Sequence, residues 1–448
     1  MSRTNGGPRG VPRVVAVIGA GYVGLPTAAT LASLGHSVTL AEREPTRLAG
    51  LRRGRMPIVE AGLDDLVADA VSAGRLRFTE SSTEAVNGAE FVFLCVPTPQ
   101  SADGSADLSF IEAAAKEIGA SLKPGSIVVN KSTVPVGSTT IVEQVIGRPD
   151  IAVVSNPEFL REGTAVLDSL NPERIVVGAD DPQAAAKVGE LFAATGAPLI
   201  VTDATTSETI KYASNAFLAT KLSFVNALAG LCEEVGADAR DVLLGLGYDK
   251  RIGFEFLRPG PGWGGSCLPK DTQALLHIAR EAGYDFSLLA GAIASNDEQL
   301  SRVITKVEAA CGGSVQGATV AVWGLTFKAN TDDRRDSPAL QIAHRLVDLG
   351  AAVQAFDPTV KAAEDPARDS DADVPDDLRE LILCADPYEA ARRASVVVVL
   401  TEWDEFRWLD FARVLEVIAE PSIVDARNLG DPAAVRRMGF HYVGIGRQ

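Results

Sequence analysis

The sequence predicts an α/β fold in which two doubly wound, parallel-sheet domains are joined by a long central helix. Three observations support this prediction. Apolar, β-branched runs alternate with helical patterns between residues 11 and 203, an unbroken helical pattern follows from Thr205 to Val235, and the alternation returns after residue 313. Strands that alternate with helices form parallel sheets covered by helices on both faces.

The chain has 448 residues, which is more than one hydrophobic core usually serves. We predict a disordered tail at residues 1–10, an α/β domain at 11–203, a central helical domain at 204–312 and a second α/β domain at 313–448. The tail is rich in Gly, Pro and Arg and lacks the apolar core of a signal peptide.

The first α/β domain is expected to begin with a buried strand, a tight turn and a helix that ends at about Leu34. This stretch has no charged residue from Val14 onward, yet its glycines and Pro26 distinguish it from a membrane-spanning helix. The strands expected in this domain are Val14–Ile18, Val38–Ala41, Phe78–Thr79, Phe91–Val96, Ile127–Val129, Ile151–Ser155 and Ile175–Gly178.

The central segment is expected to be helical on both sides of a loop rich in Gly, Pro and Arg. One helix covers Thr205 to Val235, the loop runs from Gly247 to Gly265, and helix resumes from about Lys270 to Ala310. The strands expected in the second α/β domain are Thr319–Trp323, Val353–Phe356, Val396–Leu400 and Ile423–Val424. The acidic stretch Ala363–Asp377 is expected to be a solvated surface loop.

Charge and cysteine content narrow the function classes. The formal net charge of −17 disfavours general binding of nucleic acid or of anionic membranes, although a local basic pocket for a small anion is allowed. The five cysteines are widely spaced and form no C-x-x-C pair, so neither a disulfide framework nor a structural zinc site is expected. No metal is expected, and the cytoplasm is the expected location.

A glycine motif, G-x-G-x-x-G, stands between the first strand and its helix. Gly19 permits the tight turn, Gly21 lets the backbone approach a pyrophosphate, and Gly24 allows the helix to contact the strand. Glu42 ends the second strand, where a carboxylate binds both ribose hydroxyls and repels a 2′-phosphate. The pattern predicts an NAD site, with a purely structural turn as the alternative, and nearby Arg47 partly offsets the preference over NADP.

Two further strands end in prolines and small hydroxyl residues. The first ends in C-V-P-T-P, with Pro97 and Thr98, and the next ends in K-S-T-V-P, with Thr133. Ligands bind beyond the carboxyl ends of such strands, so these residues suit a nicotinamide pocket, although simple strand termination explains them equally well. Cys95 lies in an apolar strand and is expected to be an inert core residue.

The segment N-P-E-F-L-R-E-G at residues 156–163 also follows a strand and carries Glu158, Arg161 and Glu162. A general base or a water-positioning carboxylate is the functional interpretation, and a charged helix start is the alternative.

Lys211 and Asn215 are spaced i, i+4 on one face of the long helix. They could stabilise an alkoxide and hold a water, or they could be an ordinary exposed pair.

The sharpest chemical signal is G-W-G-G-S-C-L-P-K-D at residues 262–271. A glycine loop delivers Cys267 just before a probable helix with Pro269 in its first turn. The helix N-terminus and Lys270 would both favour the thiolate, and Asp271 would be placed for acid–base work. A nucleophilic cysteine is predicted, and a buried structural cysteine fits this polar loop poorly.

The second α/β domain carries cations at strand ends, Lys328 and Arg427, which could hold phosphates or form ordinary surface ion pairs.

Together these motifs are similar to those of the nucleotide-sugar dehydrogenases, the UDP-glucose/GDP-mannose dehydrogenase family, and most closely to its UDP-glucose-oxidising members. The resemblance runs from Val14 to Asn428 and includes, in the family's order, G-x-G-Y-V-G-L, K-S-T-V-P-V-G, N-P-E-F-L-R-E-G, K-x-x-x-N-x-F-x-A-x-K and G-G-S-C-x-P-K-D.

The resemblance implies two Rossmann-like, parallel-sheet domains joined by a long central helix that forms a homodimer core. It also implies a four-electron oxidation of a C6 alcohol to a carboxylate, which reduces two NAD and consumes one water. Lys211, with Asn215 and a water, would stabilise the alkoxide and the later oxyanion. Cys267 would form a thiohemiacetal and then a thioester, which water would hydrolyse with help from Glu158, Asp271 and Thr133.

The resemblance also implies binding residues. The NAD contacts would be Tyr22, Val23, Glu42, Arg47, Pro97, Thr98, Thr133, Glu162 and Arg335. The sugar-nucleotide contacts would be Glu158, Phe159, Leu160, Lys211, Asn215, Phe256, Leu257, Arg258, Gly264, Lys328 and Arg427. Arg251 resembles a residue that the family supplies from the partner subunit.

UDP-glucose is the substrate expected from the resemblance, but loop residues do not fix the base or the sugar. GDP-mannose, UDP-N-acetylmannosamine and UDP-N-acetylglucosamine are the alternatives within the family, and Trp263 replaces the commoner Phe or Tyr of the glycine loop. Two functions outside the family also fit parts of the pattern. One is a β-hydroxyacid dehydrogenase of the 6-phosphogluconate type, which would need no Cys267, and the second is a non-enzymatic NAD(H) sensor.

Overall fold

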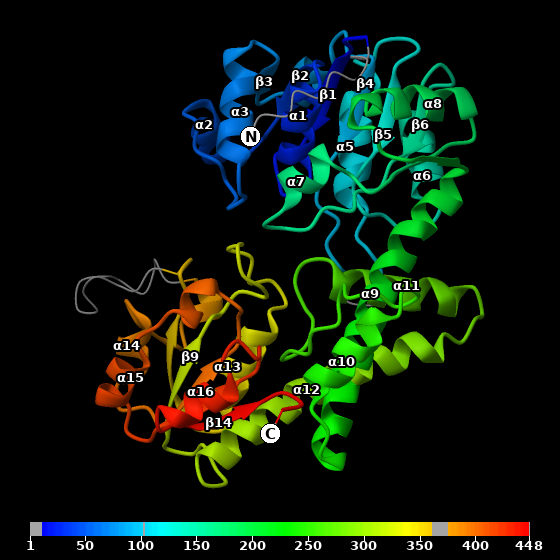
Figure 1. Ribbon diagram of the computed structural model, residues 1–448. Coiled ribbons are helices and arrows are strands. Elements are labelled where there is room, and N and C mark those ends of the chain that lie inside the picture. Colours follow the sequence, from blue (N-terminus) through cyan, green and yellow to red (C-terminus); the bar gives the residue numbers. More distant parts are fainter. Residues whose placement is uncertain (1–10, 102–103, 361–374, 448) are drawn as a thin grey trace. The chain divides into compact units, whose positions relative to one another are not determined.

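The computed structural model describes residues 11–101, 104–360 and 375–447 (Figure 1). The predicted tail at residues 1–10 and most of the predicted acidic loop, residues 363–374, lie outside the described residues. The chain packs as two compact units. Unit 1 extends to Ser214 and includes Gln273–Gly283, and unit 2 comprises Asn215–Thr272 and the chain from Tyr284 onward. The predicted central segment, residues 204–312, is thus divided between the two units.

Unit 1 contains an eight-stranded sheet in the order β3-β2-β1-β4-β5-β6-β7-β8. Its strands are β1 (Val14–Ile18), β2 (Ser37–Ala41), β3 (Leu76–Thr79), β4 (Phe91–Leu94), β5 (Ile127–Asn130), β6 (Ala152–Ser155), β7 (Ile175–Gly178) and β8 (Leu199–Thr202). The predicted parallel sheet is confirmed from β3 to β6, and β7 and β8 pair in parallel with each other. The β6–β7 pair is antiparallel. Strand β8, which was not predicted, forms one edge.

Helices cover both faces of this sheet because side chains alternate along each buried strand. In β1, Val15 and Val17 belong to one hydrophobic core, and Ala16 and Ile18 belong to the core on the opposite face. The helices of unit 1 before the unit boundary are α1 (Gly24–Ser33), α2 (Pro45–Arg52), α3 (Leu63–Ser72), α4 (Ser82–Val86), α5 (Ser109–Gly119), α6 (Ser138–Ile146), α7 (Ala165–Leu170), α8 (Pro182–Glu190) and the 3-10 helix η1 (Ala193–Thr195).

Unit 2 contains a six-stranded parallel sheet in the order β11-β10-β9-β12-β13-β14. Its strands are β9 (Thr319–Trp323), β10 (Ala352–Phe356), β11 (Ile382–Leu383), β12 (Val396–Val399), β13 (Ser422–Asp425) and β14 (His441–Gly444). Its remaining helices are α13 (Pro338–Asp348), η3 (Asp376–Leu378), α14 (Pro387–Ala390), η4 (Asp404–Arg407), α15 (Phe411–Val417) and α16 (Pro432–Arg437). The edge strands β11 and β14 were not predicted.

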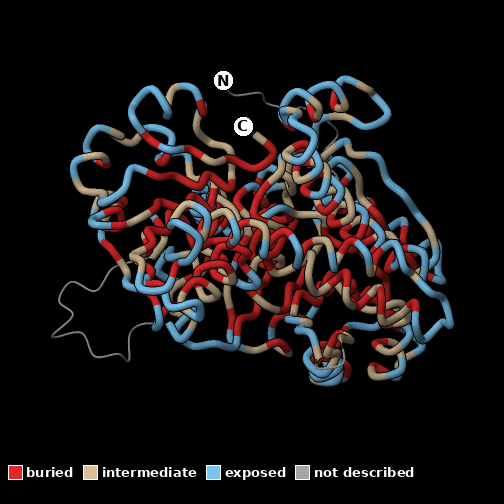
Figure 2. The backbone as a smooth tube through the Cα atoms, turned by 90° about the horizontal axis from the view of Figure 1, so that it is seen from below, coloured by how far each residue is buried: buried red, intermediate tan, exposed pale blue. Residues whose placement is uncertain are grey.

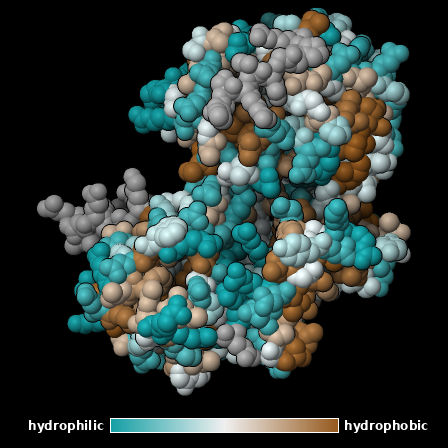
Figure 3. Space-filling view, in the orientation of Figure 1, coloured by the Kyte–Doolittle hydropathy of each residue, from teal (hydrophilic) through white to brown (hydrophobic). Residues whose placement is uncertain are grey.

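Four helices form the segment between the sheets: α9 (Ala204–Val235), α10 (Ala239–Tyr248), α11 (Leu268–Glu281) and α12 (Ser287–Ala310). The long helix α9 confirms the predicted long central helix. The predicted helical stretch from about Lys270 to Ala310 consists of two helices, α11 and α12, separated by a turn in which Gly283 has φ of 72°. The hydrophobic cores of the units are buried (Figure 2), and apolar residues also gather in separate surface patches (Figure 3).

Among the described residues, α9 is the one helix whose length and composition would allow it to cross a membrane. It carries the buried polar residues Glu208, Lys211 and Asn226. Their hydrogen bonds go to other segments of the chain: Thr139, Glu158 and Gly260, respectively. We therefore interpret α9 as a core helix of a globular fold.

Candidate active site

The glycine turn after β1 has the geometry that a dinucleotide requires. Gly19 has φ of 100°, and a Cβ there would lie 2.5 Å from the carbonyl oxygen of Cys95. A Cβ on Gly24 would lie 1.9 Å from the carbonyl oxygen of Gly19, so only glycine lets α1 begin this close to the turn. A Cβ on Gly21 would meet nothing within 4 Å. The side of the turn that a pyrophosphate would approach is therefore open.

Glu42, at the end of β2, is buried beside this turn. Its carboxylate accepts hydrogen bonds from the Ala20 backbone N–H at 3.3 Å and the Glu44 backbone N–H at 2.9 Å. The guanidinium of Arg47 lies 3.2 Å from Glu42 Oε2. Glu42 and Arg47 therefore lie together beside this turn, and half-buried Tyr22 and Val23 follow its second glycine.

The ends of β4 and β5 meet through their hydroxyl residues. Thr98 Oγ1 donates to the Thr133 carbonyl at 2.8 Å, and Ser132 Oγ donates to the Val96 carbonyl at 2.7 Å. Pro97 is exposed between them. Burial raises the pKa of the Cys95 thiol to about 12, so this cysteine remains protonated at neutral pH.

A buried ion pair links the segment after β6 to α9. Lys211 Nζ lies 2.7 Å from Glu158 Oε1, and the Leu160 backbone N–H donates to Glu158 Oε2 at 2.7 Å. Burial alone would raise the pKa of the Glu158 carboxyl, but Lys211, the Leu160 amide and Lys131 outweigh it and lower that pKa. The predicted alternative of an exposed pair on α9 is wrong for Lys211, whose side chain is 4% exposed.

Lys131, at the end of β5, is a buried residue for which no role was predicted. Its Nζ lies 3.2 Å from Asn156 Oδ1, and burial is the main cause that lowers its pKa. The signal was available, because this lysine directly follows an apolar strand within the K-S-T-V-P motif. It places a second cation near Glu158.

Phe159, which follows Glu158 in this segment, lies close to two cations. The Arg174 guanidinium carbon is 3.7 Å from the centroid of the Phe159 ring, and Lys211 Nζ is 5.5 Å from it. Leu160 and Glu162 are half-buried. Buried Glu60 accepts from the Gly163 N–H at 2.7 Å, which anchors the end of this segment.

In unit 2, Asn215 on α9 and Asp271 on α11 meet directly. Asn215 Nδ2 donates to Asp271 Oδ2 at 2.6 Å, and Lys270 Nζ donates to Asp271 Oδ1 at 2.6 Å. Asp271 is fully buried, and Asn215 is 8% exposed. The ammonium of Lys270 is thus paired with the buried Asp271 carboxylate.

Cys267 lies at the beginning of α11. Its carbonyl accepts the first hydrogen bond of the helix, from the Asp271 N–H at 2.9 Å, and Pro269 occupies the first turn as predicted. The half-buried side chain is a thiol rather than part of a disulfide, and Ser266 Oγ lies 3.5 Å from its Sγ. The helix N-terminus provides the positive potential that favours a thiolate.

Side chains from two helices anchor the loop that precedes Cys267. From α9, Asn226 Oδ1 accepts from the Gly260 N–H at 2.9 Å, and Ser223 Oγ accepts from the Trp263 indole N–H at 2.8 Å. From α12, Asn296 exchanges two hydrogen bonds with the backbone of Trp263, at 2.8 and 3.0 Å. No sequence motif pointed to Asn296 or Asn226.

The predicted sugar contacts of this loop differ in their surroundings. Leu257 is buried, Arg258 is exposed, and Phe256 has a left-handed backbone with φ of 58°. A Cβ on Gly264 would lie 2.0 Å from the Asp336 carbonyl oxygen. The packing of the chain therefore requires glycine at this position, whether or not Gly264 also contacts a sugar nucleotide. Arg251 has a side chain that is 88% exposed and pairs with Asp249 at 2.5 Å.

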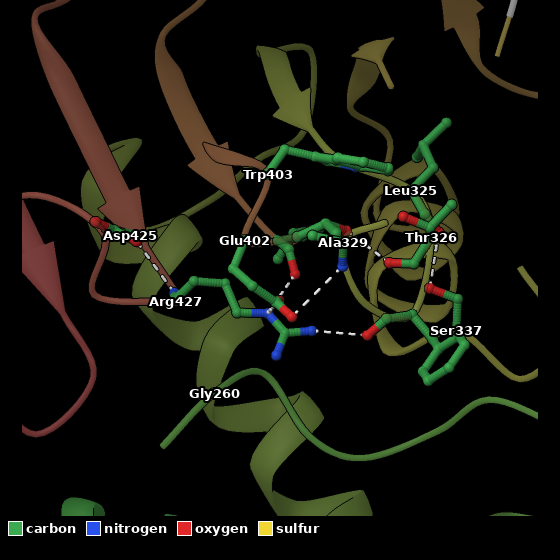
Figure 4. A network of polar contacts seen from close by, with 12 residues as sticks. Gly260, Leu325, Thr326, Ala329, Ser337, Glu402, Trp403, Asp425 and Arg427 are labelled. Atoms are coloured by element: carbon green, nitrogen blue, oxygen red, sulfur yellow. Dashed lines mark hydrogen bonds and ion pairs between the residues drawn. The ribbon is translucent and has the colours of Figure 1, made fainter. Parts of the chain in front are cut away.

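Arg427 is held at the end of β13 by carbonyl groups of unit 2 (Figure 4). Its Nε donates to the Leu400 carbonyl at 2.8 Å and lies 3.0 Å from Glu402 Oε2, and its Nη2 donates to the Phe327 carbonyl at 2.9 Å. Among the described residues Nη1 has no hydrogen-bond partner, and a Cβ added to Gly260 would lie 3.2 Å from it. Arg427 can therefore present one donor group to a ligand.

The two remaining cations are half-buried Lys328, whose Nζ lies 5.3 Å from the Phe327 ring centroid, and exposed Arg335. Arg335 pairs with the Asp333 carboxylate at 2.6 Å. Arg335 belongs to unit 2, whereas the other predicted NAD contacts belong to unit 1.

Three family models match the chain. They are described as the NAD binding domain, the central domain and the UDP binding domain of the UDP-glucose/GDP-mannose dehydrogenase family, at residues 13–195, 205–298 and 321–432. The first of these confirms the predicted cofactor, NAD, and the open glycine turn beside Glu42 fits it.

Curated relatives and solved structures agree with these matches. A UDP-glucose 6-dehydrogenase of Rhizobium meliloti is 46% identical over 97% of this chain and 99% of its own length. One from Pseudomonas aeruginosa is 44% identical over 96% and 97%. The structure of a UDP-glucose dehydrogenase from Pyrobaculum islandicum, 36% identical, superposes with a TM-score of 0.87 over 99% of both chains. The chain therefore belongs to the UDP-glucose/GDP-mannose dehydrogenase family and is an NAD-dependent nucleotide-sugar dehydrogenase.

Proposed function

We propose that the protein oxidises the C6 alcohol of UDP-glucose to the carboxylate of UDP-glucuronate, with two NAD and one water consumed. The observation that carries this proposal is Cys267, a thiol presented at a helix N-terminus by a loop that side chains from two helices anchor. An alcohol-to-aldehyde dehydrogenase needs no such nucleophile. The names of the relatives from Rhizobium meliloti and Pseudomonas aeruginosa support UDP-glucose as the sugar nucleotide.

NAD, when bound, supplies the hydride acceptor for both oxidations. In the first oxidation the protein must stabilise the negative charge that develops on the C6 oxygen. Lys211 is suited to this because it is buried and its ammonium is fixed by Glu158 at 2.7 Å. Asn215, one helical turn further along α9, is oriented by Asp271 and would hold a water or a hydroxyl group.

The second oxidation requires a tetrahedral carbon, because an aldehyde carbon cannot readily release a hydride. Addition of the Cys267 thiolate to the aldehyde forms a thiohemiacetal whose carbon carries both a hydrogen and an oxyanion. Loss of that hydrogen as hydride leaves a thioester. Water then attacks the thioester, and its oxygen enters the carboxylate while Cys267 leaves as thiolate. Glu158, Asp271 and Thr133 are proposed to orient this water, and its proton is proposed to pass to one of the two carboxylates.

The residues that bind NAD and the sugar nucleotide are proposed from the same family resemblance. The NAD contacts are proposed to be Tyr22, Val23, Glu42, Arg47, Pro97, Thr98, Thr133, Glu162 and Arg335. The sugar-nucleotide contacts are proposed to be Glu158, Phe159, Leu160, Lys211, Asn215, Phe256, Leu257, Arg258, Gly264, Lys328 and Arg427. Support is strongest for Arg427, because the carbonyls of Leu400 and Phe327 fix its guanidinium.

The purified protein is expected to form two NADH for each UDP-glucose consumed, since both oxidations occur before the acid is released. The measurement is NADH absorbance at completion with limiting UDP-glucose, together with mass spectrometry of the product. GDP-mannose, UDP-N-acetylmannosamine and UDP-N-acetylglucosamine serve as comparison substrates. One NADH per substrate would favour the hydroxyacid-type alternative, and absence of turnover with all four would contradict the proposed reaction.

We also propose a homodimer formed through α9. Phe217, Phe224 and Leu231 are spaced by seven residues and are 69%, 60% and 55% exposed. Seven-residue spacing keeps side chains on nearly one face of a helix, and an exposed apolar stripe of this kind is suited to a symmetric contact. Exposed Arg251 would then be supplied to the site of the partner subunit.

Phe224→Asp is expected to convert the dimer to a monomer, because it would place a carboxylate in the middle of the apolar stripe. Light scattering coupled to size-exclusion chromatography measures the mass directly. Val71→Asp on α3, an equivalent change at a residue that is 44% exposed, is the matched control. A wild-type monomer, or a dimer that F224D leaves intact, would contradict the proposed interface.

The cytoplasm is the proposed location. All five cysteines lie in the described part of the chain, and each carries a thiol rather than a disulfide. Thiols of this kind are typical of reducing compartments, where a nucleophilic cysteine such as Cys267 also remains in its active form.

A further inference from the structure

The residue that follows Arg427 has an unusual backbone. Asn428 is in the left-handed region, with φ of 51°. Residues with a Cβ rarely adopt this conformation, although asparagine tolerates it better than most. Such strain persists only where surrounding contacts hold it, and it is concentrated at functional sites.

The contacts that hold Asn428 come from the end of β14. Its side-chain Oδ1 accepts from the Ile445 N–H at 3.0 Å, and its Nδ2 donates to the Ile445 carbonyl at 2.8 Å. One amide side chain thus pairs with both polar groups of one backbone residue, as a neighbouring strand would. A Cβ on Gly444 would lie 2.6 Å from Asn428 Oδ1, so the chain leaves room for this amide by placing glycine there.

The C-terminal segment, residues 445–447, is itself fixed to two helices. The Gly446 N–H donates to Glu233 Oε1 of α9 at 2.6 Å, and the Gly446 carbonyl accepts from the Ala239 N–H of α10 at 2.8 Å. Lys306 of α12 pairs with the same Glu233 oxygen at 2.8 Å. Ile445 is therefore a rigid partner for Asn428.

We propose that Asn428 is a positioning residue for the nucleotide-sugar site, which acts by holding the backbone that carries Arg427. Asp425 fixes the other side of this turn, since its Oδ1 accepts from the Arg427 N–H at 3.1 Å. With both sides of the turn held, the guanidinium is directed toward the carbonyls of Leu400 and Phe327, and its Nη1 is presented beside Gly260. This inference rests on the proposed contact between Arg427 and the nucleotide.

Asn428→Ala is expected to weaken UDP binding about tenfold, because it removes the amide pair and disfavours the left-handed backbone. Isothermal titration with UDP measures this without any need for turnover. In steady-state assays the KM for the nucleotide sugar should rise, while kcat and the KM for NAD remain at the wild-type values. A role limited to overall stability would not produce that separation.

Two further variants separate the contribution of the left-handed backbone from that of the amide hydrogen bonds to UDP binding. Asn428→Gly keeps the left-handed backbone accessible but removes the amide, and Asn428→Asp keeps the acceptor for the Ile445 N–H but removes the donor. Both should fold and bind UDP with affinities between those of the wild type and N428A. Arg393→Ala is the matched control, because Arg393 is also left-handed, with φ of 59°, and Ala there carries the same backbone penalty away from Arg427.

The outcomes separate this inference from the proposed function. Wild-type affinity for UDP in folded N428A, or in N428G and N428D if N428A does not fold, would overturn the positioning role while leaving the proposed reaction intact. A wild-type protein that binds no UDP would instead overturn the proposed substrate class, and the inference with it. Weakened UDP binding in the Asn428 variants but not in R393A supports the inference.

Discussion

Cys267→Ser is expected to abolish net formation of the acid and to lower the steady-state rate of NADH production by at least on the order of 10³-fold. A serine hydroxyl is a far weaker acid than a thiol, so it forms an alkoxide much less readily than Cys267 forms a thiolate. The first oxidation does not need the thiol, so the variant should stall with no more than one NADH formed per active site. Rapid-mixing absorbance with limiting enzyme measures this amplitude.

Mass spectrometry of the denatured protein provides a second readout. Wild-type enzyme quenched during turnover should carry a covalent sugar-nucleotide adduct on Cys267, and C267S should carry none at this position. Cys311→Ser is the matched control, because Cys311 is also a half-buried thiol of unit 2 and has no proposed role. Acid formation by C267S at the wild-type rate would refute the thioester step.

Lys211→Met is expected to lower the free energy of unfolding by on the order of 3 kcal/mol at neutral pH, since it leaves the Glu158 carboxylate buried without its ion-pair partner. Turnover should fall by about 10²–10³-fold with the loss of the charge proposed to stabilise the C6 alkoxide. Urea unfolding at several pH values measures the first effect, and steady-state NADH formation measures the second.

The pH dependence of this variant follows from the Glu158 carboxyl. Its pKa is lowered in the wild-type fold, so the pair contributes stability that is present above the unfolded pKa and is lost as the pH falls through the folded pKa. In K211M burial raises that pKa, because Lys131 offsets it only partly. The stability difference between the two proteins should therefore shrink as the pH falls below the ordinary carboxyl range.

Two variants test this interpretation. Glu158→Gln combined with Lys211→Met should recover part of the lost stability, because the remaining buried group is neutral. Lys221→Met, at another lysine of α9, removes only a hydrogen bond to the Ile252 carbonyl and should cost about 1 kcal/mol or less. Equal stability of K211M and the double variant would contradict a dominant role for the Lys211–Glu158 pair.

Local sequence patterns predicted the parts of the fold that local forces determine. The strand at Val14–Ile18 and the long helix α9 were predicted because apolar periodicity marks buried strands and helices. The break between α11 and α12 was missed, although Gly283 lies there, because a single glycine is often tolerated inside a helix. The antiparallel β6–β7 pair was also missed, because strand direction depends on how the chain crosses the sheet.

In the candidate site, too, local motifs were predicted from the sequence, whereas contacts between distant segments were not. Glycine spacing indicated a dinucleotide turn after β1, and the glycine loop before α11 indicated Cys267 as a candidate nucleophile, because a fixed short motif is enough for each hypothesis. The Asn215–Asp271 contact and the anchoring of Trp263 by Asn296 join segments that are far apart in sequence. Such contacts leave no local periodicity or motif. Lys131 stands within the K-S-T-V-P motif, but its burial beside Glu158 becomes apparent only once the strands are adjacent.

The turn after β9 in unit 2 has a consequence for the order of events in catalysis. There the Asp357 carboxylate accepts from the Leu325 and Thr326 N–H groups, at 2.7 and 3.2 Å, and α13 begins only at Pro338. The donors that would cradle a second pyrophosphate are therefore occupied by the chain itself. If two NAD are reduced for each sugar nucleotide, as proposed above, both would bind in succession at the open glycine turn of unit 1. The half-oxidised sugar would then remain bound in the site while reduced cofactor leaves and fresh NAD arrives.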